Sequence, residues 1–443
     1  MHDLLSVFAA AREAGGACAL RVRGRDHTFR DLAERVDARM HALARDTGER
    51  RAHALVAGNT LDTVATLFAL LELRVPALLV HPRLTAPERD ALLAEVARAG
   101  DVPHADAAVI IHTSGTTGVP RGAVLTRAAL VASAAASAAN LGWEAGDCWL
   151  ACMPVARVGG LSILTRSLIA RRCVALAEGF DAASFPALLD DTHATLASVV
   201  PTMLARVLDA HPRWRPPARL RCVLVGGAPA PRRLLARASA RGVPIVLTYG
   251  LTESCSQVVA TPYADRFAPA LRGEGRALPG ARVRVVDGRI EVAGPMLMAG
   301  YWNGPALAPG AWFDTGDLGT LDADGCLHVH ARRGDLIVTG GENVYPVEVE
   351  RVLEACPGIV EAAVFGRPDA TWGETVAAAL VAEAGAPSAM QLQAWLGAQL
   401  APFKRPRHVC FVERLPHTAA GKLDRGALAA FAPLLQPLDA RPR

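Results

Sequence analysis

The sequence lacks the patterns that mark metal-binding, membrane and nucleic-acid-binding proteins. Its nine cysteines include no C-x-x-C pair and its 13 histidines no H-E-x-x-H spacing, so we expect neither a structural metal site nor a disulfide framework. No uninterrupted apolar run reaches the ~18 residues that a membrane span needs. There is no long Lys/Arg tract, and aromatic residues make up only 5% of the chain. We therefore expect a cytoplasmic protein with reduced thiols, no membrane span and no nucleic-acid partner.

What the chain does contain is typical of a globular enzyme with more than one domain. Its 443 residues exceed the usual size of a single domain, and 51% of them are hydrophobic against 20% charged. The net charge of +4 is the small difference between 47 basic and 43 acidic residues. The composition therefore predicts a large core and favours no highly charged partner.

The distribution of apolar runs predicts an α/β protein. Residues 1–100 alternate amphipathic helices with short strands, which is typical of a mostly parallel sheet covered by helices. Three later strands, ending near residues 153, 226 and 250, each run into a loop with polar or glycine residues. Ligands collect at the carboxyl ends of parallel strands, so these loops are expected to converge on one site.

The pattern changes twice towards the C-terminal end. Short alternating strands begin near residue 280, and the hairpin signal Asp287-Gly288 predicts a small antiparallel β subdomain over residues 280–331. A second change falls at residues 332–335. The rest of the chain has enough predicted helices and strands for a compact α+β domain of its own.

The most distinctive stretch runs from Thr113 to Gly122, directly after the apolar run of residues 107–111. It holds three glycines and four Ser/Thr hydroxyls, which predict a tight loop rich in backbone N–H groups. Such a loop suits phosphate, because glycine lets the backbone approach an anion closely and the hydroxyls add donors. The spacing is not that of a Walker P-loop, and an ordinary strand-to-helix turn uses the same residue types.

Two further stretches place a carboxylate beside hydroxyl or glycine residues. Within residues 249–253, Thr252 can donate to a phosphate and Glu253 can hold a Mg²⁺ ion that also touches phosphate oxygens, although a helix cap uses the same pair. Asp317 can accept two hydrogen bonds from a ribose diol, although turns also favour aspartate. Lys422, taken alone, is the kind of residue most often found at the surface.

Residues 113–122 resemble the phosphate-binding signature of the adenylate-forming superfamily, which includes acyl-CoA synthetases, luciferases and the adenylation domains of peptide synthetases. Five other stretches resemble motifs of the same superfamily in the same order, at residues 226–229, 249–253, 312–319, 339–346 and 416–423. The resemblance covers almost the whole chain, from the helix near Phe29 to Lys422. It implies an enzyme that activates a carboxylic acid with ATP.

The resemblance also implies which residues act. Thr252, Glu253 and Lys422 would be catalytic, with Glu253 also holding Mg²⁺. Arg121 stands where relatives usually have lysine, and it keeps the positive charge. The residues that would bind ATP are Thr113, Ser114, Gly115, Thr116, Thr117, Gly118, Arg121, Gly227, Ala228, Tyr249, Gly250, Asp317 and Arg332.

The implied fold is a large N-terminal domain of parallel-sheet α/β layers with the β subdomain, residues 1–331, followed by a small mobile α+β lid, residues 335–443. Residues 332–334 would form the hinge, where Gly334 permits a large change in φ and ψ. In the first half-reaction Lys422 would steer the carboxylate onto the α-phosphate. The lid would then rotate and bring Gly340 and Gly341 to face the thiol of coenzyme A.

Within the superfamily, the short length and residues 158–167 and 249–257 look most like the o-succinylbenzoate–CoA ligases of menaquinone synthesis. Their substrate is a keto-diacid of which one carboxyl is activated, so a fixed cation suits the spare carboxylate. Residues implied on the substrate side are Arg157, where relatives usually have histidine, Gly160, Arg166 and Ser254.

Other functions remain open from the residues alone. The same chemistry serves another aryl or acyl acid, with either coenzyme A or an acyl carrier protein as the acceptor. A nucleotide-binding pseudoenzyme would explain the departures at Arg121 and Arg157, whereas an oxidative luciferase has no support from the low aromatic content. In each ligase reading the partners are a small carboxylic acid, ATP and the thiol, and the protein is a monomer or a homodimer.

Overall fold

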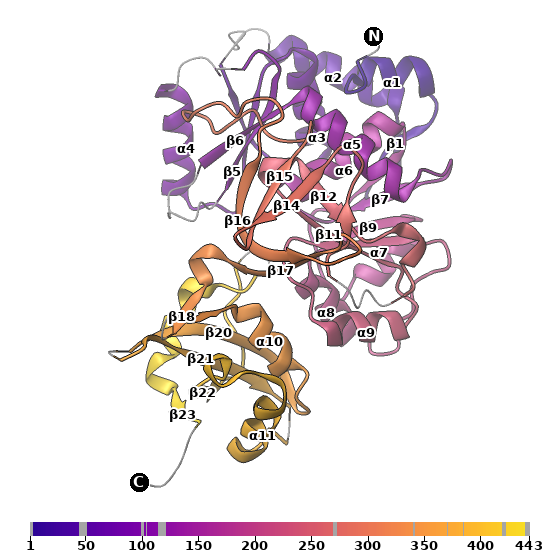
Figure 1. Cartoon of the computed structure of the whole chain (residues 1–443). Helices are drawn as coiled ribbons and strands as arrows, with labels where there is room; N and C mark the ends of the chain where they lie inside the picture. The colour runs from indigo at the N-terminus through magenta and orange to yellow at the C-terminus, as the bar shows by residue number, and fades with distance from the viewer. Residues whose placement is uncertain are drawn as a thin grey trace. The chain divides into compact units, whose positions relative to one another are not determined.

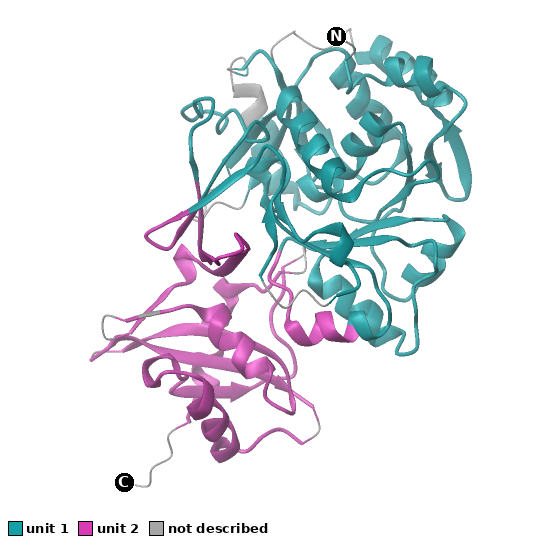
Figure 2. Cartoon of the chain, turned by 45° about the vertical axis from the view of Figure 1, so that its right-hand side comes forward, with its two compact units in different colours: residues 1–227, 238–284, 291–313 teal, residues 228–237, 285–290, 314–443 magenta. Residues whose placement is uncertain are grey.

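Contacts between residues divide the protein into two compact units (Figure 2). Unit 1 comprises residues 1–227, 238–284 and 291–313, and unit 2 comprises residues 228–237, 285–290 and 314–443. The predicted hinge at residues 332–334 lies inside unit 2, and its role as a hinge stays a prediction. The computed structural model describes residues 3–43, 51–98, 102, 104–113, 121–268, 273–339, 342–369, 371–383, 385–418 and 422–438.

The larger sheet of unit 1 is mostly parallel. Its described strands are β1 (Cys18–Val22), β2 (Arg25–Thr28), β7 (Cys148–Ala151), β8 (Cys173–Leu176), β9 (Leu196–Val199), β10 (Cys222–Gly226), β11 (Ile245–Leu251), β12 (Ser256–Ala260) and β13 (Arg276–Ala277). They lie in the order β13-β12-β11-β10-β9-β7-β8-β1-β2. Figure 1 labels β1, β7, β9, β11 and β12 of this sheet. All pairs from β11 to β1 are parallel. The loops after β7, β10 and β11 therefore leave one edge of one sheet, as predicted.

A second sheet in unit 1 carries the strands on either side of residues 114–120. Its strands are β3 (His53–Val56), β4 (Ala77–Val80), β5 (Ala107–Thr113) and β6 (Arg121–Thr126), in that order. The first three are parallel, and β6 returns antiparallel to β5, with Thr113 opposite Arg121. The sequence predicted neither β6 nor a separate sheet. Residues 123–126 form a short apolar run that passes directly into a helix, so it is easily taken for the first turn of that helix.

Helices fill the space between the two sheets and cover their outer faces. Helix α3 contacts β3 and β4, α6 contacts β7 and β8, and α5 contacts both β6 and β12 (Figure 1). Helix α3 is buried on all sides over residues 63–71, as its mostly apolar sequence predicts. The helices are α1 (Val7–Ala14), α2 (Phe29–Leu43), α3 (Leu61–Glu72), α4 (Ala86–Arg98), α5 (Arg127–Leu141), α6 (Val158–Ala170), α7 (Phe185–Asp191), α8 (Pro201–Ala210) and α9 (Arg232–Ala240), of which α9 has residues in both units.

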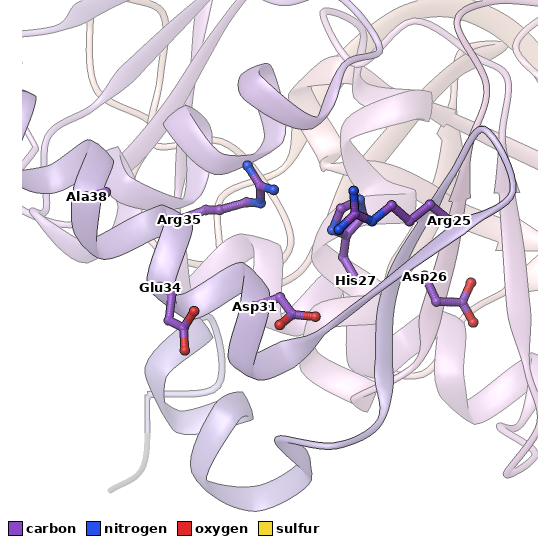
Figure 3. Close-up of a pocket in the computed structure, with 7 residues that line it drawn as sticks. All are labelled: Arg25, Asp26, His27, Asp31, Glu34, Arg35 and Ala38. Carbon is purple, nitrogen blue, oxygen red and sulfur yellow. The ribbon is translucent and has the colours of Figure 1, made fainter.

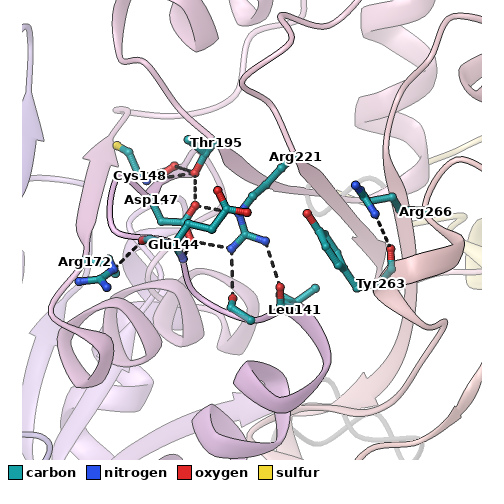
Figure 4. Close-up of polar contacts among 10 residues, drawn as sticks. Leu141, Glu144, Asp147, Cys148, Arg172, Thr195, Arg221, Tyr263 and Arg266 are labelled. Atoms are coloured by element: carbon teal, nitrogen blue, oxygen red, sulfur yellow. Dashed lines mark hydrogen bonds and ion pairs between the residues drawn. The ribbon is translucent and has the colours of Figure 1, made fainter.

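A buried ion pair fixes the amino ends of three parallel strands (Figure 4). Arg221, Asp147 and Thr195 directly precede β10, β7 and β9. Arg221 Nε donates to Asp147 Oδ1 at 2.8 Å and Nη2 to Oδ2 at 2.5 Å, and Thr195 Oγ1 donates to Oδ1 at 2.7 Å. Burial alone would raise the pKa of the Asp147 carboxyl, but the hydrogen bonds, that from Arg221 foremost, outweigh burial and lower the pKa.

The β subdomain forms a sheet of its own, and its hairpin is confirmed. The strands lie in the order β14 (Arg282–Val286), β15 (Arg289–Ala293), β16 (Phe313–Leu321) and β17 (Leu327–Arg332). Between β14 and β15 the turn residues Asp287 and Gly288 have φ values of 49° and 75°. Two successive positive φ values are typical of the tight turn that the Asp-Gly pair predicts.

The C-terminal part of unit 2 is the predicted α+β domain. Strands β18 (Ile337–Thr339), β19 (Glu342–Val344), β20 (Ile359–Asp369), β21 (Gly373–Ala382), β22 (His408–Phe411) and β23 (Gln436–Pro437) form one sheet. Helices α10 (Pro346–Glu354) and α11 (Ala389–Gln399) pack on it around an apolar core that includes Val349, Leu380 and Leu396. None of the helices in the described ranges has the length and apolar character that crossing a lipid bilayer requires.

We predict that Arg221→Met lowers the free energy of unfolding by about 3–5 kcal/mol, because it leaves the Asp147 carboxylate buried without its partner. Arg23→Met is the matched control, because the ion pair between Arg23 and Glu178 is exposed to water and such pairs contribute only ~0–1 kcal/mol. Urea unfolding followed by circular dichroism measures both. Equal losses in the two variants would contradict the role of the buried pair.

The same pair makes a pH-dependent contribution. The folded-state pKa of Asp147 lies below its unfolded value, so the contribution is complete above about pH 4 and is lost as the pH falls through the folded pKa. The difference in stability between the wild type and Arg221→Met should therefore shrink in acid.

Candidate active site

Tyr301 joins two of the stretches that the sequence singled out in unit 1. Its hydroxyl donates to Glu253 Oε1 at 2.8 Å, and the guanidinium carbon of Arg121 lies 3.7 Å from the centre of its ring. Arg121 begins β6, directly after residues 114–120, and Glu253 lies in the 3₁₀ helix η1 (Thr252–Ser254) directly after β11. A single side chain thus connects the predicted phosphate loop of one sheet with the predicted metal ligand of the other.

Backbone hydrogen bonds hold Tyr301 in this position. Trp302 N donates to Gly122 O at 2.6 Å, and Met298 N donates to Glu253 O at 2.7 Å. A larger residue at Gly122 would require its neighbours to shift, because a Cβ there would lie 2.9 Å from Ile110 Cγ2. Sequence reasoning missed Tyr301. Its only signal is an aromatic pair, Tyr301-Trp302, after a glycine in an irregular stretch.

The loop around Glu253 has an unusual backbone. Cys255 and Ser256 have φ values of 51° and 97°, a left-handed conformation that non-glycine residues rarely adopt. Ser254 is fully buried, and its hydroxyl donates to Ser256 O at 2.9 Å and accepts from Leu251 N at 3.1 Å. Ser254 therefore holds its own loop, and its contact with a substrate stays a prediction. At Gly250 no side chain fits, because a Cβ would lie 1.7 Å from Ser256 O.

The surroundings of Glu253 fit a divalent cation that is shared with phosphate. The residue is nearly buried, and one carboxylate oxygen is fixed by Tyr301. Within the described ranges, no three His, Cys, Asp or Glu side chains form a cluster that could hold a metal by themselves. Mg²⁺ is commonly bound through one or two carboxylates together with substrate phosphates and water, and one fixed carboxylate meets that requirement.

The ends of β10 and β11 lie side by side at the same edge. Gly226 pairs with Thr248, and a Cβ on Gly226 would lie 2.3 Å from Thr248 Oγ1, so glycine is required there. Gly227, the first residue of the loop after β10, has a φ of 81°, and Ala228 follows it. Tyr249 follows Thr248 on β11. The structure thus brings the predicted adenine-side residues Gly227 and Tyr249 to neighbouring strand ends.

Helix α6 carries two arginines with different surroundings. Arg157 is the N-cap residue directly before the helix and is exposed, and its Nη1 donates to His112 O at 3.4 Å, beside Thr113 at the end of β5. Burial and then the positive charge of Arg157 lower the pKa of His81. Gly160 lies in the first turn, where a Cβ would be 2.2 Å from Pro154 O. Close packing therefore explains Gly160, and its contact with a substrate stays a prediction.

Arg166 is the more unusual arginine of this helix. It is 3% exposed, and its Nε and Nη2 have no hydrogen-bond partner among the described residues. Its guanidinium carbon lies 5.9 Å from the centre of the Trp149 ring. Burial lowers its pKa to about 10. A buried guanidinium with unused donors is costly unless an anion pairs with it, so Arg166 has the properties of an anion-binding residue.

In unit 2 the structure brings together the two residues predicted to contact the nucleoside. Asp317 on β16 lies opposite Arg332 on β17, and Arg332 Nε donates to Asp317 Oδ1 at 3.1 Å. Their contact with ribose stays a prediction. A Cβ on Gly334 would meet no atom within 4 Å, so packing in this conformation does not require a glycine there.

Lys422 lies in a loop that closes on itself. Thr418 N donates to Lys422 O at 2.8 Å, and Lys422 N donates to Thr418 Oγ1 at 3.3 Å. Three residues later, Arg425 forms ion pairs with Asp335 at 3.1 Å and with Glu350 at 2.9 Å, which anchor the base of the loop. The sequence contains only one other lysine, Lys404, whose Nζ lies 2.7 Å from Glu348 Oε1.

Several predicted residues lie outside the described residues. These are Ser114, Gly115, Thr116, Thr117, Gly118, Gly340 and Gly341. Beside the last two, Thr339 pairs with Gly373, whose neighbour Trp372 is 42% exposed, and the guanidinium carbon of Arg407 lies 4.4 Å from the centre of a Trp372 ring. Sequence reasoning missed this exposed aromatic and cationic pair.

A separate hollow in unit 1 contains none of the predicted site residues (Figure 3). It lies against β2 and α2 and has a volume of about 350 Å³. Its lining contains both basic and acidic side chains. The lining residues are Arg25, Asp26, His27, Asp31, Glu34, Arg35 and Ala38. We therefore do not assign it to the active site.

Comparison with known families identifies the class of protein. The model of the AMP-binding enzyme family matches residues 94–302, and that of the AMP-binding enzyme C-terminal domain matches residues 348–422. Together with the relatives described next, these matches show that the chain belongs to the AMP-binding enzyme family. The adenylate-forming resemblance that the sequence motifs indicated is confirmed.

The similar proteins within this family include ligases that act on succinylbenzoate. A 2-succinylbenzoate–CoA ligase from Bacillus mycoides is 40% identical over 337 residues, which are 73% of this chain and 70% of the relative. The o-succinylbenzoate CoA synthetase of Bacillus subtilis, solved with the acyl-adenylate intermediate OSB-AMP, superposes with a TM-score of 0.84 at 31% identity, covering 97% of this chain and 98% of the other. The same synthetase with ATP and magnesium gives a TM-score of 0.83 at 32% identity over 96% and 98%.

We predict that Tyr301→Phe weakens binding of magnesium-bound ATP about tenfold, because a hydrogen bond to a carboxylate is lost while the ring under Arg121 stays. The affinity for ATP in the presence of a chelator should change little. Isothermal titration calorimetry measures both affinities, and Tyr263→Phe, which lies outside this set of contacts, is the control. Equal losses with and without Mg²⁺ would contradict a role of Tyr301 in placing Glu253.

Proposed function

We propose that the protein is an AMP-forming ligase that activates o-succinylbenzoate as its acyl-adenylate and transfers the acyl group to coenzyme A, a step of menaquinone biosynthesis. The family and the named relatives support the chemistry. The observation that carries the choice of acid is the buried guanidinium of Arg166, with its unused donors, in the unit that also holds Glu253. A diacid supplies the anion that this guanidinium lacks.

The first half-reaction makes a good leaving group. A carboxylate oxygen attacks the α-phosphorus of ATP in line, pyrophosphate leaves, and negative charge develops on the phosphoryl oxygens. Thr113, Arg121 and the loop between them would bind the phosphates. Mg²⁺, held by Glu253, would neutralise part of the phosphate charge. In this assignment Tyr301 keeps the Glu253 carboxylate oriented before substrates arrive.

Unit 2 supplies the remaining groups. We assign Lys422 to the approach of two anions, the carboxylate and the α-phosphate, because its charge lowers their repulsion. Asp317 would accept hydrogen bonds from the ribose hydroxyls, with Arg332 holding the carboxylate in place. The thiol of coenzyme A then attacks the acyl carbon of the mixed anhydride, and AMP leaves with the electron pair of the broken C–O bond.

The second substrate also finds suitable groups in unit 2. An exposed indole backed by a guanidinium offers a stacking face to an adenine and a positive charge to a phosphate, and coenzyme A carries both. Trp372 and Arg407 have this arrangement beside the strand that leads to Gly340. We therefore propose that they contact the nucleotide end of coenzyme A. Nine free cysteines fit our proposal of a cytoplasmic location.

We predict that incubation with ATP, Mg²⁺, coenzyme A and o-succinylbenzoate yields o-succinylbenzoyl-CoA and AMP in equal amounts, detected by liquid chromatography and mass spectrometry. Lys422→Ala should slow the adenylation step about 100-fold or more, since it removes a charge that stabilises the transition state. Lys404→Ala, the other lysine of the chain, is the matched control and should stay near the wild type. Formation of ADP, or no thioester, would contradict the proposed reaction.

We predict that Arg166→Met raises the KM for o-succinylbenzoate about tenfold to 100-fold, because a charge-assisted pair with the ring carboxylate is lost. The KM for 4-oxo-4-phenylbutanoate, the same acid without that carboxylate, should change little. Arg157→Ala should act in the same direction but less, because Arg157 is the more exposed of the two residues. Initial rates of AMP formation give both KM values.

Equal losses for the two acids in both variants would exclude these arginines as the partners of the spare carboxylate. The fold of Arg166→Met is checked by its thermal midpoint. That midpoint should not fall, because the substitution breaks no hydrogen bond at Nε or Nη2.

A further inference from the structure

Three thiols form a row across adjacent strands of unit 1, remote in sequence from one another. Cys148, Cys173 and Cys18 begin the neighbouring strands β7, β8 and β1. Cys148 lies directly opposite Cys173 in the parallel register, so both side chains project from the same face of the sheet. Cys18 Sγ lies 3.0 Å from Cys173 Sγ. The order β7-β8-β1 thus brings together cysteines that the sequence scatters.

The spacing of this pair suits a covalent bond. Adjacent strands lie at a separation that disulfides can span, and the two sulfur atoms need to approach by only about 1 Å to reach the S–S bond length. Rotation about side-chain bonds supplies such a movement. All nine cysteines are free thiols in the structure.

The two thiols also differ in the way that an attacking and a resolving cysteine differ. Cys18 is partly exposed, and a hydrogen bond from Cys173 lowers its pKa, despite the opposing effect of burial. Cys173 is buried, and its contacts with Cys148 and Cys18 raise its pKa. Burial also raises the pKa of Cys152 and of Cys222 to about 12, so Cys18 differs from these core thiols in having a lowered pKa.

We propose that Cys18 and Cys173 are a redox modification site that hydrogen peroxide converts into a disulfide. The Cys18 thiolate attacks one peroxide oxygen, the O–O bond breaks, and hydroxide leaves, which gives a sulfenic acid. The Cys173 sulfur then attacks the Cys18 sulfur, an S–S bond forms, and the hydroxyl leaves as water with the thiol proton. In total, two thiols are oxidised by two electrons and one peroxide is reduced to two waters.

The bond would link the β1-β2 hairpin covalently to β8. Among the described strands, this hairpin forms the end of the sheet opposite to β13. The bond joins the amino ends of β1 and β8, whereas Tyr249 lies on β11 and Glu253 directly after it, several strands away. We therefore expect the disulfide to leave ligase activity near its basal level while making the hairpin more resistant to unfolding. This is a property of the unit that is independent of the identity of the acid.

The test maps the bond in the full-length protein. The protein is treated with hydrogen peroxide and denatured. Its remaining thiols are alkylated with iodoacetamide, and it is digested with trypsin without reduction. Trypsin cleaves after Arg12, Arg21, Arg172 and Arg206, so the two thiols fall in separate peptides, residues 13–21 and 173–206. We expect these peptides to be linked, seven of the nine cysteines to be alkylated, and dithiothreitol to reverse the link.

Two cysteine variants and the alkylation rate of Cys18 serve as controls for this test. Cys18→Ser should abolish the link, whereas Cys326→Ser, which removes the other partly exposed cysteine, should keep it. In the untreated wild type, iodoacetamide should alkylate Cys18 about tenfold faster than Cys326, because the hydrogen bond from Cys173 lowers the pKa of Cys18. A wild-type link between Cys173 and Cys148, overoxidation of Cys18 without a link, or oxidation of Cys326 alone would each overturn the proposal.

Discussion

The alignment of the parallel strands is the constraint on which the rest of unit 1 depends. Arg221 and Asp147, both nearly buried, pair at the amino ends of β10 and β7, and Thr195 adds the amino end of β9. Once these ends are level, the carboxyl ends lie at one edge and the loops after them are neighbours. The pair thus acts on the site from the opposite end of the strands. This alignment also explains why the protein keeps the buried charges of Asp147 and Arg221, whose desolvation is unfavourable, at the end of the strands opposite to the proposed site.

A second contact joins the two sheets where the chemistry is proposed. The predicted phosphate loop follows β5 of the four-stranded sheet in the sequence, and Glu253 lies between β11 and β12 of the nine-stranded one, so we expect both sheets to contribute to the site. Tyr301 connects them through Arg121 and Glu253, and Arg157 adds a contact from α6 to the end of β5. The loop that carries Glu253 keeps two positive φ values, and local strain of this kind is typical of functional sites.

Much of the fold and part of the site could be predicted from the sequence, for reasons that particular residues make plain. Asp287-Gly288 forms the predicted hairpin, and β7, β10 and β11 end close to where their apolar runs predicted. These features depend on local signals. The second sheet, the role of Tyr301, the exposed Trp372 and the enclosed hydroxyl of Ser254 depend on contacts between residues distant in sequence, which local patterns do not encode. The burial of Arg166, whose Nε and Nη2 have no hydrogen-bond partner among the described residues, likewise depends on tertiary packing that the sequence does not reveal.

The central claim is that this chain activates a diacid through an adenylate. The most direct measurement is acid-dependent exchange of labelled pyrophosphate into ATP, without coenzyme A, over o-succinylbenzoate, benzoate, anthranilate, 4-hydroxybenzoate and medium-chain fatty acids. We predict rapid exchange with o-succinylbenzoate and little with the monoacids. Faster exchange with a simple aryl acid would keep the adenylation chemistry and contradict the proposed acid. No exchange with any acid on the panel would contradict the proposed catalysis itself.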